Sequence, residues 1–243
     1  MYPNQYQHRI EKEEVNQLPL VEFKGEVVIV RDETAFAEAI DYLQKQSCVG
    51  VDTETRPSFV KGQHYPTALV QIATTQRCYL FQLKHLGFRK ELAELFANPQ
   101  ICKVGLAFKD DLNGLQRLHR FTPSHCIDIQ KMVLKYGILD LGLQKIFAIV
   151  FQKKISKAQQ LTNWENATLT AEQARYAATD AWATLLIYKR LKRTKKLPQP
   201  VYMQLREEDL KRQLQHQQEV LAEKEAEQEQ QNEKQHLNSE FDG

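Results

Sequence analysis

The chain has 243 residues, of which 42% are hydrophobic and 26% charged, with a formal net charge of +2. No apolar run approaches the roughly 18 residues of a membrane-spanning helix, and the N-terminal stretch lacks the apolar core of a signal peptide. The four cysteines form no C-x-x-C pair, which argues against a zinc knuckle or a redox dithiol and favours reduced thiols. We therefore expect neither a membrane nor a secreted protein, but a cytoplasmic one, or a nuclear one if the source is eukaryotic.

Charge is distributed unevenly along the chain. Residues 201–243 carry five basic and eleven acidic side chains, so the first 200 residues hold 28 basic against 20 acidic ones. The C-terminal stretch is also too poor in large apolar residues to offset the chain entropy of folding. We predict an N-terminal extension over 1–24, a folded domain over 25–197, and an acidic, Gln/Glu-rich tail over 198–243 that is helical or disordered. The basic domain suits a polyanionic ligand, and the acidic tail offers a surface for a protein partner.

The folded domain alternates between strand-like and helix-like segments. Strands are predicted at 25–30, 48–54, 67–74, 77–83, 101–106 and 125–129. Helices are predicted at 34–46, 88–97, 108–119, 128–136, 140–149 and 171–193. Consecutive strands followed by strand–helix alternation indicate an α/β fold, a mixed sheet covered by helices.

Helix ends are marked by capping residues. Asp32 is a candidate N-cap for the first predicted helix, and Asp128 and Asp140 are interpreted as caps of later ones. Thr170 and Gln173 form a capping box, which places the start of the last helix.

A D-x-E motif ends the strand predicted at 48–54. Asp52 and Glu54 are two residues apart, so in a strand their carboxylates point to the same face. Two anions held together beside a buried strand are unfavourable without a cation between them. A strand end that runs into a solvated loop explains the same pattern, so the motif alone leaves both interpretations open.

Two further aspartates occupy the first turn of the helix at 108–119. Asp110 shares a solvent-facing stripe with Arg117, and the helix macrodipole accounts for its acidity. Asp111 shares the opposite stripe with Leu115 and Leu118, which we expect to face the core. A bound metal would explain a carboxylate at that position.

The last predicted helix places Tyr176 and Asp180 four residues apart on a face that continues with apolar side chains. A buried Tyr–Asp hydrogen bond explains this pair by itself. Taken together, however, the inward-facing carboxylates of three segments would repel one another in a dry core. Divalent cations with a preference for oxygen ligands, Mg²⁺ or Mn²⁺, would relieve that repulsion. No histidine stands at a ligand-like spacing, which disfavours zinc.

The order of these motifs resembles the DEDD superfamily of 3′-to-5′ exonucleases, in the tyrosine branch that includes ribonuclease D and the Werner-syndrome-type exonuclease domain. The similarity covers roughly residues 26–193, through the strings VDTETRPSF, ALVQIAT, KVGLAFKDDL, LGLQKI, TNWENATLTAEQ and YAATDAWATLLIY. It implies a ribonuclease H-like (DnaQ-like) fold with a five-stranded mixed sheet flanked by helices.

The resemblance also implies roles for individual residues. The four ligands of two metal ions correspond to Asp52, Glu54, Asp111 and Asp180. Tyr176 corresponds to the tyrosine that orients the attacking water. The histidine branch places a histidine five residues before the last aspartate, where this chain has Arg175, so the tyrosine branch is the consistent assignment.

Substrate contacts are expected in the loop 55–66, where basic and aromatic residues alternate in a way that suits single-stranded nucleic acid. The residues expected to contact substrate are Thr53, Arg56, Phe59, Gln71 and Trp164. For Phe59 the alternative is a hydrophobic plug under the loop, for Gln71 a structural amide, and for Trp164 a packing role. Three lysines are further candidates for the substrate groove: Lys153, Lys154 and Lys157.

The function expected from the resemblance is a two-metal 3′-5′ exonuclease that releases nucleoside 5′-monophosphates from a nucleic acid with a free 3′ end. DNA is favoured, because the tail is too polar to form the extra nucleic-acid-binding domain usual in ribonuclease D. Trimming of RNA 3′ ends is the alternative within catalysis. An inactive exonuclease fold that binds nucleic acid or serves as an adaptor is the alternative outside it.

Overall fold

The computed structural model describes residues 6–58, 60, 62–63 and 65–241, with the side chains of 223–241 excepted. The chain divides into two compact units, Met1–Leu197 and Pro198–Gly243, which are described separately.

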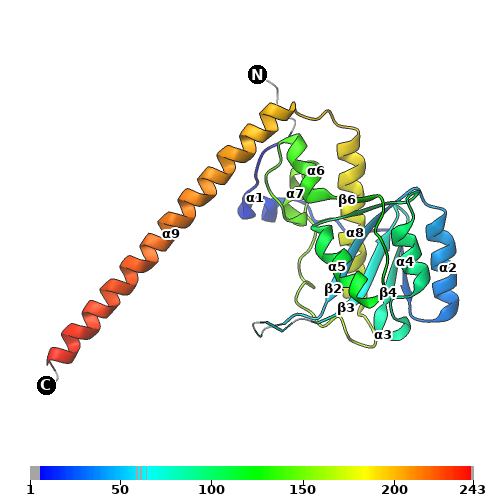
Figure 1. Cartoon of the computed structure of the whole chain (residues 1–243), viewed down its shortest axis with the longest axis horizontal. Helices are drawn as coiled ribbons and strands as arrows, with labels where there is room; N and C mark the ends of the chain where they lie inside the picture. The colour runs from blue at the N-terminus through cyan, green and yellow to red at the C-terminus, as the bar shows by residue number, and fades with distance from the viewer. Residues whose placement is uncertain (1–5, 59, 61, 64, 242–243) are drawn as a thin grey trace. The chain divides into compact units, whose positions relative to one another are not determined.

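The first unit is built on a mixed sheet of six strands (Figure 1). These are β1 (Glu26–Val30), β2 (Cys48–Thr55), β3 (Thr67–Ala73), β4 (Arg77–Gln82), β5 (Cys102–Gly105) and β6 (Cys126–Asp128). Their order across the sheet is β1-β4-β3-β2-β5-β6, with β3 antiparallel to both of its neighbours and the other pairs parallel. The predicted α/β fold is confirmed. The sheet has one strand more than the resemblance implied, because the short β6 pairs with β5 at the edge.

The helices of this unit cover both faces of the sheet. They are α1 (Lys12–Gln17), α2 (Glu33–Gln44), α3 (Leu83–Leu86), α4 (Lys90–Ala97), α5 (Phe108–Leu118), α6 (Ile129–Val133), the 3₁₀ turn η1 (Leu134–Tyr136), α7 (Leu143–Phe151) and α8 (Ala171–Lys192). Figure 1 shows the sheet between α8 on one face and α2 with α4 on the other. The capping box at the start of α8 is confirmed, as is the Asp32 cap of α2.

One predicted cap is wrong. Asp128 caps α6 as expected, accepting a hydrogen bond from Gln130 N at 3.0 Å. Asp140 caps no helix, and α7 begins only at Leu143. The carboxylate of Asp140 is buried and accepts a hydrogen bond from Ile10 N at 2.8 Å, so it anchors the N-terminal segment. A cap is a local pattern, whereas this bond joins residues 130 positions apart.

Strand β2 presents alternate side chains to the two faces of the sheet. Val49 and Val51 are fully buried in the core formed with α2, α4 and α5. Gly50 faces α8. A Cβ at Gly50 would clash with the carbonyl oxygen of Ala181 and lie 2.9 Å from Leu185 Cβ. The absence of a side chain at Gly50 therefore lets α8 pass directly over β2, two residues before Asp52.

The N-terminal segment is packed into the first unit. Four apolar side chains in its described part are buried: Tyr6, Ile10, Val15 and Phe23. The guanidinium of Arg175 on α8 donates hydrogen bonds to the carbonyl oxygens of Phe23 at 2.7 Å and Gly25 at 3.2 Å. The residue at the position of the histidine branch thus has a structural role, holding the start of β1 against α8.

The second unit consists of one long helix, α9 (Gln199–Phe241). Of the two predicted states of the tail, helical or disordered, the backbone adopts the helical one as far as Phe241. Glu, Gln, Lys and Ala dominate this stretch and are strong helix formers, which accounts for the continuity. None of the described helices combines the length and the apolarity that a membrane crossing requires.

Candidate active site

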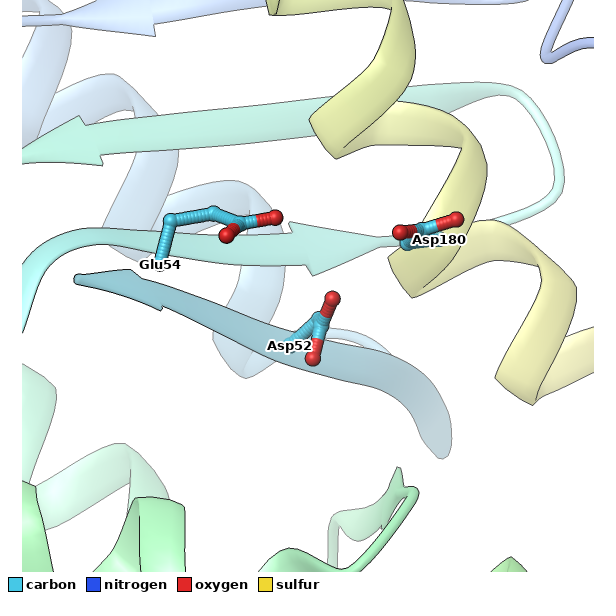
Figure 2. A group of neighbouring side chains, drawn as sticks. All are labelled: Asp52, Glu54 and Asp180. Carbon is cyan, nitrogen blue, oxygen red and sulfur yellow. The ribbon is translucent and has the colours of Figure 1, made fainter. Parts of the chain in front are cut away.

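Three carboxylates meet where α8 crosses β2. Asp52 and Glu54 lie at alternate positions on β2, and Asp180 lies in the middle of α8. One carboxylate oxygen from each of them lies within 4.8 Å of the others. Figure 2 shows the three groups turned toward one another. The period of two in the strand and the close approach of α8 at Gly50 together produce this cluster.

Asp111 reaches the site from the other face of the sheet. It lies in the first turn of α5 and accepts a hydrogen bond from Thr53 Oγ1 at 2.6 Å. Thr53 stands between the two acids of the D-x-E motif, so its side chain points away from theirs. On the stripe shared with Asp111, Leu115 is fully buried as predicted. Leu118 is 41% exposed, which corrects the expectation that it faces the core, because it lies in the last turn of α5.

Burial raises the pKa of all four acids, and repulsion from the other site carboxylates adds to this rise at Asp52 and Glu54. Burial first, and then the charges of Asp180, Glu54 and Asp111, raise the pKa of Asp52 well above its ordinary value. Burial and the neighbouring carboxylates raise the pKa of Glu54 to about 9. Burial also raises the pKa of Asp111 to about 6, against the hydrogen bond from Thr53. When no cation is bound, Glu54 therefore holds a proton near neutral pH, whereas Asp111 is mostly ionised.

Asp180 is the most buried member of the cluster, with 8% of its surface exposed. Burial raises the pKa of Asp180 to about 7, although a hydrogen bond from Tyr176 and the charge of Lys157 act in the opposite direction. The donor set of this cluster is made of carboxylate oxygens alone. Such a set, whose repulsion a dication would relieve, fits a hard divalent cation and offers no ligand that zinc prefers.

Tyr176 lies one helical turn before Asp180 and is 9% exposed. Burial, followed by the charges of Asp180 and Glu54, raises the pKa of Tyr176 above its ordinary value. The phenol therefore stays protonated at neutral pH and can act as a hydrogen-bonding group but not as a base. Its ring packs against Trp164, with the ring centroids 6.0 Å apart.

Two cavities open onto the acids. One, of about 310 Å³, is lined by Asp52, Glu54 and Asp180 together with Tyr176 and Lys157. The other, of about 540 Å³, lies between the loop after β2 and α5 and includes Asp111 in its lining. Thr53 lines both cavities. The acids thus stand at the junction of two hollows large enough for parts of a nucleotide.

The residues expected to contact substrate have different positions. Thr53 and Arg56 line the larger cavity. Arg56 is exposed, and its Nη1 lies 3.5 Å from Oε2 of Glu165. Its guanidinium carbon lies 4.8 Å from the centroid of the Tyr65 ring. Phe59 lies outside the described residues.

Trp164 and Gln71 are fully enclosed. Trp164 is 1% exposed, so neither face of its indole is free to stack on a base. Gln71 is 0% exposed and pairs with Asp52 across β2 and β3. Neither residue therefore has an exposed surface through which it could contact substrate directly. In the described part of the chain the side-chain amide of Gln71 has no hydrogen-bond partner.

Asn113 and Arg117 of α5 also line the larger cavity, although their sequence pattern did not predict it. Both lie on the side of α5 that was interpreted as a solvated stripe with Asp110. That stripe does face solvent, but the loop after β2 rises opposite it and forms a cavity wall. A pair of polar residues four positions apart, the first of them two residues after the candidate metal ligand Asp111, was the available signal.

Comparison with known proteins finds similarity to nucleases that act from the 3′ end. A family model described as 3′-5′ exonuclease matches residues 27–196. The mouse protein named bifunctional 3′-5′ exonuclease/ATP-dependent helicase WRN is 31% identical over 189 residues, covering 72% of this chain and 13% of that protein. Ribonuclease D of Haemophilus influenzae is 28% identical over 163 residues, covering 66% of this chain and 40% of that protein. The chain thus spans less than half the length of each of these two relatives.

Solved structures share the fold. The Nibbler EXO domain of Aedes aegypti superposes with a TM-score of 0.64 at 23% identity, covering 76% of this chain and 99% of that domain. Trypanosoma brucei RNase D in complex with RNA U12 gives a TM-score of 0.65 at 20% identity, covering 72% of this chain and 65% of that one. These likenesses confirm the exonuclease fold expected from the resemblance.

Proposed function

Since the chain belongs to the 3′-5′ exonuclease family, we propose that it hydrolyses the terminal phosphodiester bond at the 3′ end of a nucleic acid and releases a nucleoside 5′-monophosphate. The observation that carries this proposal is the convergence of Asp52, Glu54 and Asp180 within 4.8 Å, with Asp111 joined to them through Thr53. An inactive relative would not need to hold so many repelling carboxylates together.

The acids would hold two divalent cations. Asp52, Glu54 and Asp180 form one group of ligands, and Asp111 supplies a carboxylate on the other side of β2. When bound, such ions lower the pKa of a coordinated water and neutralise negative charge on the phosphate. Both Mg²⁺ and Mn²⁺ prefer oxygen ligands, and we propose these two as the metals that support activity.

The phenol of Tyr176 would orient the attacking water. It lies on the same cavity wall as the three clustered acids, and its raised pKa keeps the hydroxyl group protonated at neutral pH. A protonated phenol can hold a water molecule by hydrogen bonds without removing its proton. Tyr176 is therefore assigned to orientation of the nucleophile.

For the substrate we propose DNA, with RNA as the alternative. The T. brucei RNase D structure with bound RNA U12 supports the alternative. The larger cavity suits either nucleic acid, because Arg56 and Arg117 in its lining can pair with the phosphates of DNA and of RNA alike.

The test is incubation of the full chain with 5′-end-labelled single-stranded DNA, recessed duplex DNA and RNA, each with Mg²⁺, Mn²⁺ or EDTA. We expect a ladder of products shortened from the 3′ end, formed with either metal and abolished by EDTA. The preferred substrate decides between DNA and RNA. Binding of all three without any shortening would favour the adaptor interpretation and reject the proposed activity.

A further inference from the structure

Lys157 stands out among the side chains that line the smaller cavity. The described lining of this cavity contains three carboxylates, and Lys157 is the cation among them. Its side chain is exposed to solvent. Among the described residues, no hydrogen bond or ion pair to its ammonium group is found, although its charge acts on Asp180. The ammonium group is therefore available to a ligand that enters the cavity.

The backbone just before Lys157 is held in place. Lys154 N donates to the carbonyl oxygen of Pro19 at 3.0 Å, and Lys154 O accepts from Val21 N at 2.9 Å. Ile155 is 1% exposed, and its carbonyl oxygen accepts a hydrogen bond from Gln144 Nε2 at 2.7 Å. These bonds fix the base of the loop, so Lys157 is presented to the cavity from a rigid support.

Part of this support comes from outside the family-matched region. The match begins at residue 27, whereas Pro19 and Val21 belong to the N-terminal segment. The same segment is tied to α8, since Phe23 N donates to Thr179 Oγ1 at 3.0 Å. The segment thus links the loop of Lys157 to the helix that carries Tyr176 and Asp180.

Charge balance indicates what Lys157 would bind. Four carboxylates are balanced by two divalent cations. The phosphodiester, and the additional charge that develops when an oxygen nucleophile attacks it, would then leave the site with a net negative charge. A lysine ammonium group is a compact donor that suits a single phosphate oxygen.

We propose that Lys157 is a further catalytic residue, which contacts a non-bridging oxygen of the phosphate at the cleavage site. This inference rests on the proposed exonuclease function and adds a residue to it. A contact that strengthens as charge develops on the phosphate raises the rate of the chemical step more than it tightens substrate binding.

The first test compares three variants of the full chain on the preferred labelled oligonucleotide. We expect Lys157→Ala to lower kcat about 10- to 100-fold with KM changed by less than about threefold. Lys157→Arg should recover most of the rate, because it keeps the charge. The control is Lys131→Ala, which removes an exposed lysine of α6 that lines neither cavity. The rate of this control should stay within about twofold of the wild type. A kcat for Lys157→Ala within twofold of the wild type, or a loss confined to KM, would overturn the inference.

The second test needs no turnover and separates the inference from the proposed function. Calorimetry measures binding of Mn²⁺ alone, and then of a nucleoside 5′-monophosphate in the presence of Mn²⁺. We expect Lys157→Ala to weaken nucleotide binding about 5- to 10-fold while Mn²⁺ binding stays unchanged, and Lys131→Ala to change neither. Equal nucleotide affinity in all variants, an absence of nucleotide binding by the wild type, or an equal loss of Mn²⁺ affinity would reject the phosphate contact. A wild type that binds nucleotide through Lys157 but cleaves no nucleic acid would reject only the exonuclease proposal.

Discussion

Two regions of this molecule concentrate carboxylates, and they treat them in opposite ways. In the cluster of β2 and α8, burial and mutual repulsion raise the pKa of Glu54 to about 9. On α9, Glu207 is exposed and lies 2.9 Å from Lys211 Nζ, and the hydrogen bond from this lysine lowers the pKa of Glu207. The same chemical group is thus harder to ionise in the first region and easier to ionise in the second.

The difference shows that the number of acids in a segment says little about its chemistry. Water and Lys211 stabilise the charge of Glu207, which therefore needs no further ligand. The clustered acids are largely buried, and the charge of Lys157 only partly offsets the rise in the pKa of Asp180, so the folded chain holds repulsion that a bound dication would relieve. This contrast can be tested by changing one region at a time.

Removal of one clustered carboxylate should have the largest effect. We expect Asp52→Asn to lower nucleotide release by about 10³-fold or more, because Asp52 is one of the three clustered carboxylates that would hold metal. The metal-free variant should be at least as stable as the wild type, since a repelling charge is lost. Exonuclease assays and thermal unfolding in EDTA measure the two effects. Full activity in Asp52→Asn would reject the site.

Tyr176→Phe should have the next largest effect. The ring stays packed against Trp164, so the fold is kept, but the hydroxyl group that would orient water is lost. We expect kcat to fall about 10²-fold with little change in KM. Steady-state kinetics and a circular dichroism spectrum measure both properties. An unchanged kcat would remove Tyr176 from the mechanism.

The stability of the metal-free chain should depend on pH through the cluster. The folded-state pKa of Glu54, about 9, and that of Asp180, about 7, lie above their ordinary values, so the folded chain binds more protons than the unfolded chain. The contribution of these groups to stability is present at low pH and is lost as pH rises through their folded-state pKa values. Between pH 6 and 9 we expect the free energy of unfolding to fall by about 2–4 kcal/mol.

Urea denaturation in EDTA across this pH range measures the loss. Addition of Mn²⁺ should stabilise the chain more at pH 9 than at pH 6, because the metal competes with protons for the same oxygens. A metal-free stability that stays level or increases with pH would show that the acids are not clustered in solution.

The smallest effect is expected on α9. Glu207→Gln removes one partner of an exposed ion pair to Lys211, which solvent and salt already screen. We expect no resolvable change in the thermal midpoint, in helix content by circular dichroism or in nuclease rate. A clear loss of activity in this variant would mean that α9 takes part in the function, and the comparison of the two regions would need revision.

Much of the site could be predicted from local periodicity in the sequence. The period of two in β2 puts Asp52 and Glu54 on one face, and helical spacing puts Tyr176 and Asp180 on one side of α8. The inward position of Asp111 follows from the same rule. The start of α8 could also be predicted, because the capping box of Thr170 and Gln173 lies within four consecutive residues.

Interactions between residues far apart in the sequence could not be predicted in this way. The burial of Trp164 under the ring of Tyr176, the anchoring of Ile10 by Asp140 and the hold of Arg175 on the carbonyl oxygen of Phe23 join segments that no local pattern relates. Each such contact depends on which surfaces meet after the sheet has formed.

The sequence by itself determined which side chains share a face, because backbone geometry repeats every two residues in a strand and every 3.6 in a helix. Only the tertiary structure decided that α8 crosses β2 at Gly50, that Asp111 joins the acids from the opposite face through Thr53, and that Lys157 lines the cavity beside Asp180. The physical reason is that these arrangements are set by close packing and by hydrogen bonds between segments far apart in the chain.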